Sequence, residues 1–307
     1  KKVILTFAIF CIMNMIQAQN PFLEKYTTPH GTAPFDKIKK EHFEPALEEG
    51  MKQHMAEIYA IVNNPEAPNF KNTIVALEKS GALLNRVQSV FSNLLSAETN
   101  DDLQAIAEKM MPLLSEHSNN INLNKKLFER VKAVYSQMNK LKLNKEDSKL
   151  LQNTYDSFVR SGANLEGEAK AKYRALTAEL SKLTLQYGQN ILKETNNYEL
   201  VITDKAKLAG LPESTLEAAA LTAKEKGKEG WVFTLNAPSY IPFMTYCENR
   251  ELRKELYTAF STLCTHDNEY NNFANVKRIA NIRQEIAQLL GYKNYAAYTL
   301  EKRMAEN

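Results

Sequence analysis

Glycine and proline are scarce in this sequence, each occurring 10 times in 307 residues. A mainly β protein of this size needs many tight turns, and such turns are rich in both residues. Long stretches instead carry apolar residues at helical spacing without interruption. The composition therefore favours a mainly α-helical fold.

Signatures of nucleotide binding and of covalent catalysis are also missing. Residues 162–167 have the glycine spacing of a phosphate-binding loop, but Glu168 follows where the motif needs lysine, and a carboxylate there would repel a phosphate. Neither G-x-G-x-x-G nor G-x-S-x-G occurs. The formal charge is only +3, without the basic face that nucleic acids require, so we expect no nucleic-acid partner.

The sequence has 5 histidines, none of which begins the H-E-x-x-H motif of a zinc site. His54 and Glu57 share one helical face, but a single pair cannot supply three protein ligands, and it predicts a polar contact on the surface. Residues 266–269 read HDNE, which predicts a loop leading into a helix. The sequence thus predicts no catalytic, cofactor-binding or metal-binding residue within this chain.

The first residues have the three-part pattern of a secretory signal peptide. Lys1 and Lys2 are followed by an apolar stretch from residue 3 to residue 16, and Ala18 offers a cleavage position. This stretch is shorter than the about 20 residues that span a bilayer. Residues 1–18 therefore predict export to the periplasm or the cell exterior, with no membrane attachment after cleavage.

Cysteine is rare as well, with Cys11, Cys247 and Cys264 as its three positions. An exported protein could pair the two that survive cleavage, but their spacing along helical sequence gives no support for a bridge. We expect two unpaired, buried thiols.

Apolar residues recur at helical spacing through most of the chain. The longest predicted helix covers residues 166–194, with one apolar stripe that requires a packing partner. Pro112 is expected to kink or end the helix that starts after a capping box at residues 99–102. Residues 198–203 and 231–235 are β-branched or alternating, and predict a small two-stranded ribbon joined by a helix. Pro238 and Pro242 then mark a predicted turn.

Several segments resemble the zinc metallopeptidases of the thimet oligopeptidase family, most of all its bacterial peptidyl-dipeptidase branch. Residues 230–257 read GWVFTLNAPSYIPFMTYCENRELRKELY and carry much of the resemblance. Further similar segments follow the family's order: residues 34–47, 72–81, 84–91, 154–163, 208–212 and 290–298.

The resemblance implies long antiparallel helices in an ellipsoid of two halves, with a deep channel for short unfolded peptides. It also implies a catalytic zinc ion held by an H-E-x-x-H helix and a later glutamate. The zinc ion activates a water, the glutamate of the motif acts as general base, and a peptide bond is hydrolysed. The peptidyl-dipeptidase branch releases dipeptides from free C-termini. Tyr240 and Tyr246 could face such a channel, although the stretch around them is better explained as packed scaffold.

The family's zinc helix lies downstream of every matched segment, so we expect the Zn²⁺ ligands to lie outside this chain. Residues 1–18 would be the signal peptide, residues 19–235 the N-terminal helical domain, and residues 236–307 the start of the catalytic domain, truncated before the zinc helix. The chain alone would then be inactive. The alternative is a non-catalytic helical module, derived from the same family, that binds peptides or a partner.

Overall fold

The computed structural model describes residues 20–306 and is mainly helical, as predicted. The predicted signal peptide, residues 1–18, lies outside the described residues. Within residues 20–306, no helix combines the length and the apolar character needed to cross a membrane.

Internal contacts divide the chain into two units. Among the described residues, unit 1 comprises residues 20–182 and 282–306, and unit 2 comprises residues 183–281. Two helices, α8 (Gly167–Asn197) and α12 (Phe273–Leu289), contribute residues to both units. The domain boundary predicted between residues 235 and 236 concerns a longer protein, and it stays a prediction.

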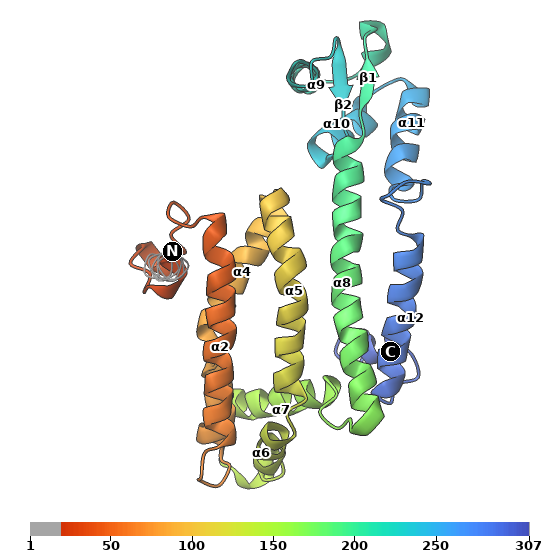
Figure 1. The fold of residues 1–307 in the computed structure, drawn as a ribbon. Helices are drawn as coiled ribbons and strands as arrows, with labels where there is room; N and C mark the ends of the chain where they lie inside the picture. Colours follow the sequence, from red (N-terminus) through yellow and green to blue (C-terminus); the bar gives the residue numbers. More distant parts are fainter. Residues whose placement is uncertain (1–19, 307) are drawn as a thin grey trace, which may run out of the picture. The chain divides into compact units, whose positions relative to one another are not determined.

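Unit 1 is built from helices that pack in pairs (Figure 1). Helix α2 packs against α4 and α5, and α6 packs against α7. Gly50 permits the close approach of α2 and α4, because a Cβ atom there would lie 3.0 Å from Cα of Leu84. The elements confined to this unit are η1 (Pro21–Leu23), η2 (Pro29–Gly31), η3 (Lys40–His42), α2 (Phe43–Val62), η4 (Phe70–Val75), α3 (Ala76–Lys79), α4 (Ala82–Ala97), α5 (Asp101–Asn122), α6 (Lys125–Tyr135), η5 (Met138–Lys140), α7 (Lys145–Arg160) and α13 (Tyr295–Leu300).

Aromatic rings form the core at the N-terminal end of α2. The ring of Phe43 lies 5.2 Å from that of Phe22 and 5.2 Å from that of Phe91, measured between ring centres. All three side chains are buried. A segment before α2 is thereby held against the helix pair by apolar contact.

The predicted cap of α5 and a predicted end of this helix at Pro112 need correction. Asn100, not Thr99, caps the helix, since its side-chain oxygen accepts a hydrogen bond from the backbone N–H of Leu103. Helix α5 also continues through Pro112 to Asn122. Met110, Leu114, His117 and Ile121 form a buried stripe on both sides of the proline. Burial of this stripe offsets the cost of about 3 kcal/mol that an interior proline imposes.

The predicted ribbon is present in unit 2. Strand β1 (Leu200–Ile202) pairs antiparallel with β2 (Trp231–Phe233), and Val201 lies opposite Val232. Helix α9 (Glu213–Glu225) connects the strands after the short helix η6 (Lys205–Leu208). Helices α10 (Ala237–Tyr246) and α11 (Arg250–Ser261) follow the ribbon.

The ribbon and α10 share one apolar core. The rings of Phe233 and Phe243 meet edge to face with centres 4.6 Å apart, and both are fully buried together with Leu256. Pro238, in the first turn of α10, and Pro242 both lie inside this helix and not in the predicted turn. Because Pro242 has no N–H, the backbone carbonyl of Pro238, one turn earlier, has no helical hydrogen-bond donor. Pro238 is exposed, so this carbonyl can bind water.

Candidate functional site

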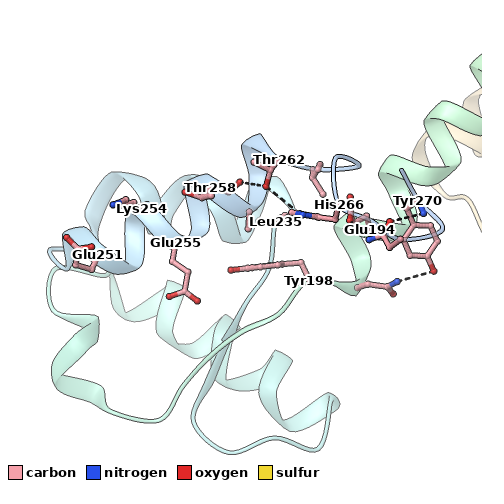
Figure 2. A pocket seen from close by; sticks show the side chains of 14 residues that line it. Glu194, Tyr198, Leu235, Glu251, Lys254, Glu255, Thr258, Thr262, His266 and Tyr270 are labelled. Carbon is pink, nitrogen blue, oxygen red and sulfur yellow. Dashed lines mark hydrogen bonds between the residues drawn. The ribbon is translucent and has the colours of Figure 1, made fainter. Parts of the chain in front are cut away.

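Unit 2 contains a pocket of about 860 Å³ (Figure 2). Its walls come from the end of α8, from α11 and from the loop that follows α11. The lining residues are Glu194, Asn197, Tyr198, Leu235, Glu251, Lys254, Glu255, Thr258, Ala259, Thr262, Leu263, His266, Asn268 and Tyr270.

One face of α11 supplies a polar wall of this pocket. Glu251, Glu255, Thr258 and Thr262 follow one another at steps of three or four residues, which places them in a row along the helix. Leu256 lies outside this row and is fully buried in the core of the unit. Burial of the apolar face therefore turns the polar row toward the pocket.

Tyr198 and Glu255 both reach into the pocket (Figure 2). Burial raises the pKa of Tyr198, and the negative charge of Glu255 raises it further. The phenol is therefore protonated at neutral pH and is available as a hydrogen-bond donor.

Glu194 fixes the loop that closes one end of the pocket. Its carboxylate accepts hydrogen bonds from the side-chain amide of Asn268, at 2.9 Å, and from the backbone N–H of Cys264. Burial acts to raise the pKa of Glu194, but these hydrogen bonds outweigh it and lower the pKa. Burial, reinforced by the neighbouring Glu194, raises the pKa of the Cys264 thiol to about 11.

His266 belongs to the predicted loop between α11 and α12. Its Nε2 lies 3.4 Å from Oγ1 of Thr262, and that hydroxyl donates to the carbonyl of Thr258 at 2.7 Å. Because the hydroxyl proton is used in this way, Nε2 of His266 is the donor to Thr262. The imidazole is exposed, so this contact orients it at the pocket edge.

The chemistry of the pocket is that of a binding site. It offers carboxylates, hydroxyls, amides and one imidazole around a partly apolar floor. Among residues 20–306, no three His, Cys, Asp or Glu side chains lie together in a way that could hold a metal ion. The described residues therefore do not fit the catalytic zinc site that the family resemblance implies.

His54 and Glu57, expected to make a surface contact, belong to a hydrogen-bonded network of unit 1 in which Glu57 is exposed and His54 is half-buried. Nδ1 of His54 lies 3.0 Å from Nε2 of His117, and Glu57 accepts the backbone N–H of Gly81 at 2.7 Å. Burial lowers the pKa of His54 and lowers that of His117 to about 4. No sequence pattern indicated this network, because its members come from separate helices.

The expectation of unpaired cysteines is confirmed for the described part of the chain. Cys247 and Cys264 are free thiols and both are buried.

Tyr240 stacks on Phe260 with ring centres 4.5 Å apart, whereas Tyr246 is exposed.

Comparison with known proteins finds a matching family model and relatives that include bacterial and plant proteins. Residues 243–307 match the model of peptidase family M3. The chain is 39% identical over 288 residues to dipeptidyl carboxypeptidase of Escherichia coli, an alignment covering 94% of the chain and 42% of the relative. It is 35% identical over 292 residues to oligopeptidase A of Salmonella typhimurium, covering 94% and 42%. A probable cytosolic oligopeptidase A of Arabidopsis thaliana is 30% identical over 295 residues, covering 94% and 41%.

The chain thus spans about two fifths of the length of these relatives. The similarity to them extends over nearly all of its own residues and includes the segment matched by the family model. Over nearly all of its length the chain is thus similar to dipeptidyl carboxypeptidase and oligopeptidase A, and residues 243–307 match peptidase family M3.

Proposed function

We propose that this chain is the N-terminal portion of an exported zinc metallopeptidase that hydrolyses short peptides and releases dipeptides from their C-termini. The observation that carries the proposal is the 39% identity to a dipeptidyl carboxypeptidase over 94% of the chain. The identity to the relatives named oligopeptidase A is lower, at 29–35%. This difference favours dipeptide release over cleavage inside a peptide.

The proposed domain boundaries follow the matched segments. Residues 19–235 form the N-terminal helical domain, and residues 236–307 begin the catalytic domain. The match of residues 243–307 to the family model supports this boundary. The Zn²⁺ ligands lie outside the described residues, and the bound ion supplies an activated water for peptide hydrolysis. The chain by itself is then inactive.

In this proposal, the pocket of unit 2 contacts the peptide substrate. Glu251 and Glu255 offer carboxylates, Tyr198 offers a donor to a peptide carbonyl, and Nδ1 of His266 offers an acceptor for a peptide N–H. A volume of about 860 Å³ is of the size that holds a small ligand. Short unfolded peptides are therefore the partners, and neither nucleic acid nor a membrane has a role.

Dipeptide release is tested on the whole protein with a short peptide that is blocked at its N-terminus. We expect mass spectrometry to detect a C-terminal dipeptide when the C-terminus is free, and no product when it is amidated. A zinc chelator should abolish the reaction and added Zn²⁺ should restore it. Equal cleavage of the amidated peptide would assign an oligopeptidase instead. Peptide binding without any cleavage in the presence of Zn²⁺ would assign the non-catalytic module.

The role of the pocket is tested with Glu255→Gln. This substitution removes a charge from the pocket wall, and we expect KM to rise several-fold while kcat is unchanged. Glu225→Gln is the matched control, because Glu225 is exposed at the end of α9 and does not line the pocket. Equal kinetics for the two variants would exclude the pocket from substrate binding.

Export is tested separately by N-terminal sequencing of the mature protein. The proposal expects Gln19 as the first residue, since cleavage would follow Ala18. A mature protein that retains Lys1 would remove the argument for a periplasmic or extracellular location.

A further inference from the structure

Two histidines from different helices meet nitrogen to nitrogen in unit 1. Nδ1 of His54, on α2, lies 3.0 Å from Nε2 of His117, on α5, and the ring planes are inclined by 56°. His54 is half-buried and only 8% of His117 is exposed. The proposed peptidase function makes no use of this pair.

Hydrogen bonds around His54 settle which of its nitrogens carries the proton. The hydroxyl of Ser80 donates to the carbonyl of Leu77 at 2.7 Å, so its oxygen accepts from Nε2 of His54 at 3.2 Å. Nε2 therefore bears the proton, and Nδ1 presents a lone pair toward His117. A histidine that binds a metal ion is held in the same way, with its other N–H donated to a neighbouring acceptor.

The two rings border a pocket, although the backbone packs closely on one of them. Gly81 has a φ of +71°, and a Cβ atom there would lie 2.8 Å from Nδ1 of His54, so only glycine fits beside this ring. Both imidazoles line a pocket of about 250 Å³. Four further residues of its wall carry amide or hydroxyl groups: Asn85, Gln88, Ser118 and Asn122. The pocket thus gives an ion a path to the rings, as well as oxygen ligands or space for water.

The separation of the two nitrogens selects the kind of ion. Imidazole nitrogens bind at about 2.0–2.1 Å, so two of them 3.0 Å apart subtend an angle of about 95° at a shared ion. That angle matches neighbouring positions in square-planar or octahedral coordination, which Cu²⁺ and Ni²⁺ adopt with nitrogen and oxygen ligands. Tetrahedral Zn²⁺ requires a wider angle.

We propose that His54 and His117 form a two-histidine site for a divalent transition-metal ion, Cu²⁺ or Ni²⁺. Water and the amide or hydroxyl oxygens of the pocket complete the coordination. His54 binds through Nδ1 without changing its protonation. His117 binds through Nε2 after the proton on that nitrogen moves to Nδ1, so the ring stays neutral and no proton is released. The site has fewer side-chain ligands than a catalytic zinc site, and it is independent of the proposed peptidase activity.

The site is tested by titrating the full chain, produced without a histidine tag, with NiCl₂ and CuCl₂ in a calorimeter. We expect one ion per chain and, for Cu²⁺, electron paramagnetic resonance with hyperfine splitting from two nitrogens. His54→Gln and His117→Gln should each weaken binding by at least about ten-fold. Ser80→Ala, which removes only the partner of Nε2, should weaken it by about ten-fold while both ligands remain.

His30→Gln is the matched control, since His30 is exposed and lies outside the pocket. It should bind like the unaltered chain. Circular dichroism with a chelator present should show that each variant is folded. If one of the two ligand variants fails to fold, the other still tests the site. Absence of binding to the unaltered chain overturns the proposal. So does undiminished binding by a folded His54 or His117 variant, or an equal loss in His30→Gln.

Discussion

Arg160, at the end of α7, is expected to hold the C-terminal part of unit 1 in place. Its guanidinium donates to the hydroxyl of Tyr292 at 3.0 Å and to the carbonyl of Tyr298 at 2.7 Å, and it forms an ion pair with Glu301. It also lies 4.2 Å from the ring centre of Tyr298. One side chain thus contacts three residues that are more than 130 positions away in the sequence.

The magnitude follows from these contacts. Each hydrogen bond from a charged donor contributes about 1.5 kcal/mol, and the cation–π contact adds about 0.5–1 kcal/mol. The ion pair is half exposed at Glu301 and adds less than about 1 kcal/mol. Water can replace part of these interactions in the variant. Arg160→Ala should therefore lower the free energy of opening this part of unit 1 by about 3 kcal/mol. Arg160→Lys should recover less than half, because a lysine has neither the fork of donors nor the flat stacking surface.

The assay is amide hydrogen exchange, followed by mass spectrometry on peptides that cover residues 292–301. A cost of about 3 kcal/mol corresponds to about 100-fold faster exchange if α13 opens locally. Lys302→Ala is the control, because the ion pair from Lys302 to Asp156 spans 2.7 Å but is exposed, and should be worth less than about 1 kcal/mol. Equal exchange in Arg160→Ala and Lys302→Ala would refute the reasoning.

Three further predictions concern unit 2, where Trp231 provides a fluorescent probe. Gly230→Ala should lower the urea-unfolding free energy by about 2 kcal/mol, because Gly230 has a φ of +82° and a Cβ atom would lie 2.3 Å from the carbonyl oxygen of Ile202; unchanged unfolding would contradict this. Phe243→Ala should cost about 3–5 kcal/mol because the ring is fully buried, and a cost below about 1 kcal/mol would show that the core is loosely packed. Cys264 should react with iodoacetamide at pH 8 about 100-fold more slowly than an ordinary thiol, because its pKa is raised from 9.0 to about 11, and reaction as fast in the native as in the denatured chain would disprove the shift.

The helices and the ribbon were predictable because their signals are local. The stripe in residues 166–194 and the alternation around residues 200 and 232 depend only on neighbouring residues, and the structure contains α8, β1 and β2 at these places. Pro112 shows the limit of local rules. Its effect on α5 is decided by the buried stripe on both sides of it, which the sequence does not reveal by itself.

The pocket of unit 2 and the histidine pair were not predictable for a different reason. Glu194 and Asn268 are 74 positions apart, and His54 and His117 are 63 apart. Neither pair has a spacing that distinguishes it from ordinary surface residues, since their proximity follows only from tertiary packing. The family resemblance, in contrast, was carried by ordered segments such as residues 230–257, which contain information that no single motif holds.

Burial of Cys247 and Cys264 has a practical consequence for experiments. If cleavage of the proposed signal peptide removes Cys11, a maleimide dye finds no accessible natural thiol among residues 20–306. Two cysteines introduced at exposed positions, one in each unit, could therefore be labelled selectively. Single-molecule energy transfer between the dyes would then measure the distance from one unit to the other and its response to a peptide.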